Sequence, residues 1–89
     1  MRAVITVIGK DTVGILAAVS SECTAYGVNV TEVTQSVLKD LFAMIMMIDI
    51  SSSTIPFSEL TDRLNALGEK MGLKIHTMHE DIFNSMHRI

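Results

Sequence analysis

Residues 11–15, Asp-Thr-Val-Gly-Ile, form the segment best suited to bind a small polar ligand. They stand between a β-branched run and an apolar periodic run, which predicts a loop leading into a helix N-terminus. Such a terminus offers unpaired backbone N–H groups and a positive dipole to a carboxylate. Asp11 can accept hydrogen bonds from an ammonium group, and Gly14 lets a ligand or a second backbone approach closely. The structural alternative is that Asp11 or Thr12 caps the helix and Gly14 only permits packing.

A second group of candidate ligand residues follows Gly27. Asn29 carries an amide that both donates and accepts hydrogen bonds, which suits the polar end of an amino acid. Val30 comes next, and Gln35 lies further along the same partly polar run. The structural alternative is that Asn29 satisfies turn geometry after the glycine and that Gln35 is a solvated edge residue.

The C-terminal segment holds the chain's one cluster of metal-ligand residue types: His79, Glu80, Asp81 and His87. Imidazoles and carboxylates hold zinc and other divalent cations, but this spacing matches no established site. Asp81 has a simpler role as the cap of a C-terminal helix, so we expect no metal. Cys23 falls on an apolar helical stripe, which indicates a buried structural thiol. With no phosphate-binding glycine motif or paired catalytic carboxylates, we expect neither an enzyme nor a cofactor.

The composition narrows the function classes further. The chain has 89 residues, 48% of them hydrophobic, and a net charge of −3. An acidic module lacks the basic footprint that phosphate backbones require, so direct nucleic-acid binding is not expected. One cysteine cannot form an internal disulfide, and no apolar run reaches the roughly 18 residues that span a bilayer. We therefore expect a cytoplasmic protein without membrane contact.

Hydrophobic periodicity predicts six elements and a tail. One helix carries the stripe Leu16, Val19, Cys23 and Tyr26, and a second carries Phe57, Leu60, Leu64, Leu67 and Met71. In the tail, Ile82, Phe83, Met86 and Ile89 share one helical face. The predicted elements are, in order, a strand at 2–9, a helix that follows a cap at Asp11 or Thr12 and ends at Gly27, strands at 28–38 and 41–50, a helix that opens at Pro56 and closes at Gly72, and a strand at 73–79.

This order is the α+β, ferredoxin-like βαββαβ arrangement, with two helices on one face of a four-stranded antiparallel sheet. We expect one domain at residues 1–80 and a short helical tail at 81–89. The strands at 2–9 and 41–50 are apolar on both alternating sets of positions. The sheet face without helices must therefore be covered by the tail, by a partner subunit, or by both. A domain this small also gains from dimerisation.

Two segments give the chain a resemblance to a known family. Residues 9–16, Gly-Lys-Asp-Thr-Val-Gly-Ile-Leu, and residues 26–30, Tyr-Gly-Val-Asn-Val, resemble the corresponding segments of ACT domains. The resemblance covers about residues 2–80 in order and spacing. With its tail, the chain is similar to standalone single-domain ACT proteins and to halves of the glycine cleavage system transcriptional repressor.

This resemblance implies a regulatory, amino-acid-sensing module that pairs side by side as a homodimer. The effector would sit between the loop after the first strand and the start of the neighbour's second strand. The alternative is a constitutive protein–protein interaction module with a protein target and no small ligand. The ligand-binding residues that the resemblance implies are Asp11, Thr12, Val13, Gly14, Ile15, Asn29, Val30 and Gln35.

Overall fold

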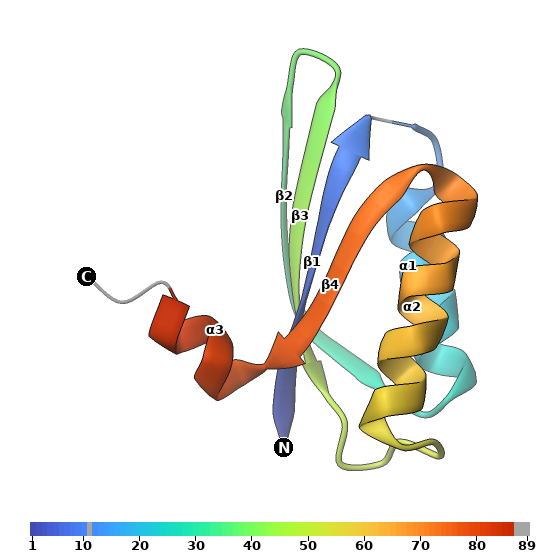
Figure 1. Cartoon of the computed structure of the whole chain (residues 1–89), viewed down its shortest axis with the longest axis vertical. Helices are drawn as coiled ribbons and strands as arrows, with labels where there is room; N and C mark the ends of the chain where they lie inside the picture. The colour runs from blue at the N-terminus through green and yellow to red at the C-terminus, as the bar shows by residue number, and fades with distance from the viewer. Residues whose placement is uncertain (11, 87–89) are drawn as a thin grey trace.

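A four-stranded antiparallel sheet carries two helices on one face and a third, short helix at the end of the chain (Figure 1). The computed structural model describes residues 1–10 and 12–86. Among these residues no helix is long and apolar enough to cross a membrane. The elements are β1 (Arg2–Lys10), α1 (Ile15–Ala25), β2 (Asn29–Leu38), β3 (Leu41–Asp49), α2 (Phe57–Met71), β4 (Leu73–His79) and α3 (Glu80–Met86).

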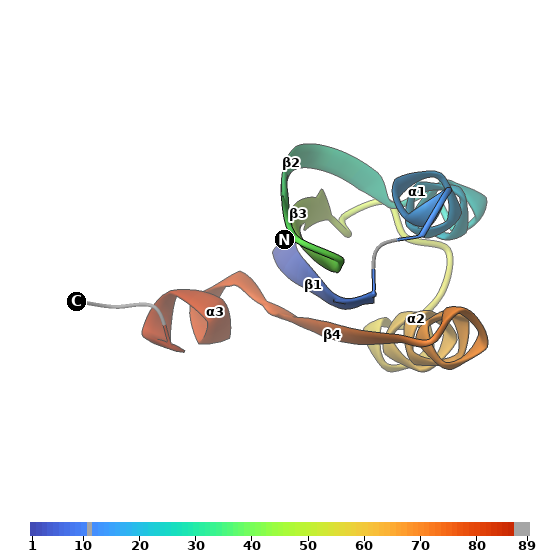
Figure 2. The ribbon, with the colours of Figure 1, turned by 90° about the horizontal axis from the view of Figure 1, so that it is seen from above.

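The strands lie in the order β2-β3-β1-β4, all antiparallel to their neighbours. Figure 2 shows α1 and α2 side by side on one face of the sheet, with α3 projecting on the other side. The ferredoxin-like fold predicted from periodicity is therefore confirmed. The order leaves β2 and β4 at the two sheet edges.

The core lies between the sheet and the two long helices. Leu60 and Leu64 of α2 are fully buried, and Phe57, Leu67 and Met71 pack partly buried against them, so the predicted α2 stripe is confirmed. The predicted buried stripe of α1 was wrong at its first residue, Leu16. Ile15 is 2% exposed and Leu16 38% exposed, so the buried stripe is Ile15, Val19 and Cys23.

The predicted caps of two helices also differ from the structure. Gly14, in the left-handed region at φ 86°, is the N-cap of α1, and no side chain of the described residues caps this helix. Thr12 as the cap was therefore wrong, because the helix starts later than the polar residues suggested, and the alternative cap, Asp11, lies outside the described residues. Asp81 is likewise not a cap, since α3 begins at Glu80 and Asp81 lies in its first turn.

The β2–β3 hairpin closes through the predicted Lys39-Asp40 turn. Lys39 adopts φ 59°, so the turn forms with a lysine where asparagine or glycine is usual. The pairing register shifts between Val30 and Glu32, which marks a β-bulge on the edge strand near its start. Beyond the bulge every residue of β2 is exposed.

The sheet face opposite α1 and α2 is apolar, as the doubly apolar strands predicted. Strand alternation directs Val4, Ile8 and Ile45 to this face, because Ala3, Ile5, Val7 and Met46 lie in the core. Val4 is fully buried near α3, whereas Ile8 and Ile45 are 49% and 38% exposed. The tail helix therefore covers only part of the face.

Candidate functional site

The N-terminal end of α1 is an open turn of backbone. The first intrahelical bond joins the Ala18 N–H to the Gly14 carbonyl at 2.9 Å. The N–H groups of Ile15, Leu16 and Ala17 come before it, so they have no partner within the helix. Within residues 12–86, no side chain caps this end and its first turn holds no carboxylate. The helix therefore presents N–H groups and positive dipole to an anionic group.

Gly14 is required here by its backbone angle. At φ +86° an L side chain is strained, but a Cβ at this position would meet no atom within 4 Å. Packing within this chain therefore does not explain the glycine. The space beside Gly14 is open, and Val13 next to it is 98% exposed.

Asn29 begins β2 and is exposed, with Asp49 of β3 opposite it. It follows the C-terminal end of α1, whereas Gly14 precedes the N-terminal end (Figure 1). The eleven residues of α1 put roughly 16 Å between those ends. A single chain therefore does not bring the Gly14 loop and Asn29 together.

The other predicted ligand residues fall into two classes. Thr12 and Gln35 are exposed, with Gln35 opposite Met44 in the middle of the edge strand. Ile15 is buried and Val30 packs against the core, so these two can offer a ligand only their backbone groups. Asp11 lies outside the described residues.

The bulge on β2 is a feature of the site that the sequence did not reveal. Thr31, the extra residue between Val30 and Glu32, donates its hydroxyl to the Met47 carbonyl at 3.2 Å. Bulges redirect the side chains of a strand and interrupt its pairing edge. This one separates Asn29 from the straight part of β2, and no glycine or proline signals it.

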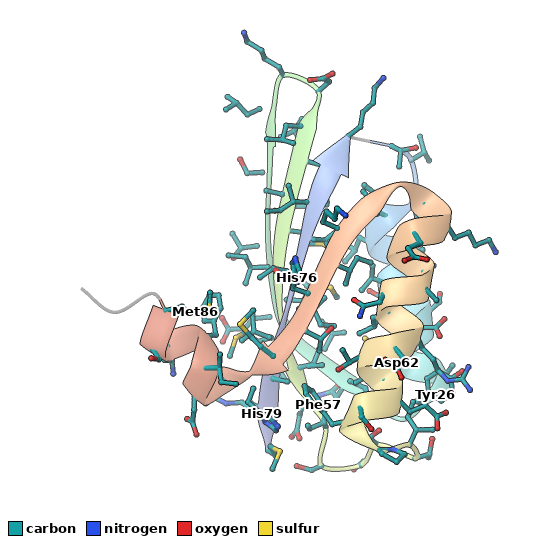
Figure 3. The ribbon with its side chains drawn as sticks, viewed as in Figure 1. Tyr26, Phe57, Asp62, His76, His79 and Met86 are labelled. Atoms are coloured by element: carbon teal, nitrogen blue, oxygen red, sulfur yellow. The ribbon has the colours of Figure 1, made fainter. Side chains whose placement is uncertain are left out.

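Two of the residues whose types could bind a metal, His79 and Glu80, have other partners. The His79 ring lies 4.5 Å from the Phe57 ring, as Figure 3 shows near the lower end of the sheet. Glu80 pairs with Arg2 at 2.6 Å. Across residues 1–10 and 12–86, no three His, Cys, Asp or Glu side chains are grouped to hold a metal ion. His87 and the tail residue Ile89 lie outside the described residues.

Cys23 is the one thiol of the chain, and it lies fully buried on α1. Burial raises its pKa from 9.0 to about 11, and the nearby Glu22 carboxylate adds to the shift. The thiolate, which is the nucleophilic form, is therefore scarce at neutral pH. This arrangement suits a packing role.

Comparisons with known proteins agree with the fold. The family model described as the ACT domain matches residues 2–78. A UPF0237 protein of Listeria innocua is 46% identical over 89 residues, which is the whole of both chains. The solved ACT domain protein from Streptococcus pneumoniae is 35% identical with a TM-score of 0.80 over 93% of each chain. A glycine cleavage repressor-like protein of known structure is 26% identical with a TM-score of 0.75, over 85% of this chain and 43% of its own.

Proposed function

This chain belongs to the ACT-domain family, and we propose that it is a cytoplasmic regulatory module that binds an amino acid or a similar small molecule at a homodimer interface. It senses the ligand and catalyses no reaction. The observation that carries the proposal is the uncapped, open N-terminus of α1 at Gly14. A helix end with unpaired N–H groups and no acidic neighbour in its first turn is a receptor for a carboxylate.

A side-by-side dimer completes the site. The backbone edge of β2 is unpaired within the described chain, because β2 ends the sheet order. An exposed ten-residue edge strand favours pairing with another strand. When two β2 strands pair antiparallel, the start of β2 in one chain lies beside the end of β2 in the other. The Gly14 loop of one chain then approaches Asn29 of its neighbour, although the two are far apart within one chain.

Each residue has a distinct role in this site. The N–H groups at the start of α1 bind the effector carboxylate, and Asp11 accepts hydrogen bonds from its ammonium group. Asn29 of the neighbour contributes its amide, and Val30 contributes backbone groups. Gln35 lies further along β2, where it contacts the dimer partner or a longer ligand side chain.

Titration calorimetry with the twenty amino acids tests the proposal. At least one should release or absorb heat and raise the melting temperature of the wild type. Asp11→Ala and Asn29→Ala should each weaken that binding and leave the dimer intact. Asn65→Ala is the matched control, because Asn65 is an exposed amide on α2 outside the site. If the folded wild type binds none of the twenty, the ligand-sensing function is rejected.

The second candidate is a constitutive protein-interaction module. It is favoured by one observation, the incompletely covered apolar sheet face beside α3. Deleting residues 81–89 distinguishes the two functions. Under this alternative the deletion abolishes target binding and no amino acid has any effect, whereas under ligand sensing the calorimetric response survives the deletion.

A further inference from the structure

The sheet face without α1 and α2 exposes several large apolar side chains that the proposed function does not use. We call it the helix-free face, and it is formed by alternate residues of the four strands. Ile8, Leu41 and Ile45 on it are 49%, 47% and 38% exposed. Large side chains exposed together on one face mark a contact surface, whereas scattered ones need no explanation. The apolar residues that define the face are Ile8, Leu38, Leu41, Ala43, Ile45 and Met78.

A groove runs along this face beneath α3. It has a volume of about 440 Å³, and its walls include Ile8 and Ile45 from the sheet with Phe83 and Met86 from α3. Figure 3 labels Met86 on α3 and His76 on β4, two residues of its lining. The groove is open, so α3 and the sheet do not close on each other.

The helix α3 is itself incompletely packed. It has seven residues, none of them buried, and Ile82 and Met86 are 52% and 66% exposed. A helix of two turns has little stability of its own in water, so it depends on contacts. Among the described residues its backbone lies close to β1 and β4 alone. The exposed side chains of Ile82 and Met86 thus remain available to a second surface.

Charges are distributed unequally along the helix-free face. Its upper end carries Lys10, opposite Leu41 in the register, and Lys74, opposite Ile8. Its lower end carries Arg2, paired with Glu80, and the exposed carboxylate of Asp81 in the first turn of α3. Because the Arg2–Glu80 pair is balanced within the chain, the unpaired charge is two lysines at one end and the Asp81 carboxylate at the other, and an inverted copy brings these opposite charges together.

We propose that a second copy of this chain covers the helix-free face, packed face to face with its strands antiparallel. The two-fold axis lies between the sheets and perpendicular to the strands, so α3 of each copy approaches the Lys10 and Lys74 end of the other. The exposed residues of α3 and of the two sheets then form one apolar layer, which closes the groove.

The size of the face fits this occupant. Four strands about 4.8 Å apart and seven to ten residues of about 3.3 Å give a flat footprint of roughly 450–600 Å². Side-chain relief and α3 add to this flat area, and a standard protein interface buries roughly 800 Å² per partner. A small molecule in the groove would leave most of this area uncovered.

This interface is separate from the ligand site proposed above. The ligand site uses the β2 edge and the start of α1, whereas the second copy uses the opposite face of the sheet. Both interfaces can form at once, which makes four chains in the complete assembly. If the β2 edge does not pair, the face-to-face contact alone makes two chains, so the failure of either proposal leaves the other testable.

Sedimentation equilibrium of the full chain tests the inference. Ile45→Glu places a charge in the centre of the face and should halve the mass, from four chains to two or from two to one. Ala66→Glu, on the exposed outer side of α2, is the matched control and should leave the mass unchanged. A wild type that is monomeric, or an Ile45→Glu variant that is folded by circular dichroism and keeps its mass, overturns the proposal.

A charge exchange tests the orientation without placing a charge in the core. Lys74→Glu should weaken the assembly roughly tenfold, because each interface then has two like-charge contacts. Lys74→Glu combined with Asp81→Lys should restore it. Failure of the double variant to recover contradicts the antiparallel arrangement. A monomeric wild type that binds anilinonaphthalene sulfonate would assign the groove to an apolar ligand instead.

Discussion

Replacing Gly14 and Gly27 by alanine separates backbone strain from steric contact. Both glycines lie in the left-handed region, at φ 86° and 73°, so alanine suffers a similar strain of about 1–2 kcal/mol at each. Their surroundings differ. A Cβ on Gly14 meets nothing within 4 Å, whereas one on Gly27 lies 2.7 Å from the Ser52 carbonyl oxygen. That oxygen belongs to the backbone, so overpacking adds about 1–3 kcal/mol at Gly27 alone.

Urea unfolding, followed by circular dichroism at one fixed protein concentration, measures the two losses. We expect Gly14→Ala to lower the free energy of unfolding by about 1–2 kcal/mol and Gly27→Ala by about 2–5 kcal/mol. In a domain of this size each kcal/mol lowers the melting temperature by about 4–8 °C. Equal losses at the two positions would refute the reasoning, because the Ser52 contact would then contribute nothing. No loss at Gly14 would show that the open loop does not hold its left-handed conformation.

Three further predictions concern buried and terminal groups. Cys23, with its pKa raised to about 11, should resist a thiol reagent at pH 8 until the chain unfolds. The protonated thiol contributes to stability below pH 9, and this contribution should be lost as the pH rises from about 9 toward 11. Hydrogen bonds from the side chain and backbone of Ser51 lower the pKa of Asp49 below 3.8. Its contribution to stability is therefore present above that pH and lost below it, and a carbon-detected NMR titration of Ser51→Ala should show the Asp49 pKa moving back up. The Thr77 hydroxyl is buried without a hydrogen-bond partner among the described residues, so Thr77→Val should be neutral or stabilise the fold by about 1 kcal/mol in urea unfolding. A clear destabilisation by Thr77→Val would mean that the hydroxyl has a partner.

Much of the fold could be predicted from hydrophobic spacing. The α2 stripe and the bounds of β4 follow from strict periodicity, and the doubly apolar β1 and β3 predicted a sheet face that needs cover from the tail, a partner or both. The start of α1 could not be placed, because Ile15 and Leu16 are adjacent and equally apolar. Only the position of the helix on the sheet decides that Ile15 is buried.

The candidate site was predictable in its residues but not in its geometry. Open space beside Gly14 depends on what the rest of the chain leaves uncovered, which no local pattern encodes. The β2 bulge at Thr31 arises from pairing with β3, a partner distant in sequence. The separation of Gly14 from Asn29 by the length of α1 became evident only with the elements in place, and it makes a partner chain part of the proposed site.

The most direct test of the central claim is subunit complementation. Asp11→Ala and Asn29→Ala chains, each weakened in effector binding when alone, are mixed in equal amounts and left to exchange subunits. The mixture is then titrated with whichever amino acid binds the wild type. If each site combines Asp11 of one chain with Asn29 of its neighbour, every mixed dimer has one intact site. Binding should then return to about a quarter of the wild-type stoichiometry, since about half of the dimers are mixed. No recovery after verified exchange would contradict the account, because it would put both residues of a site in the same chain.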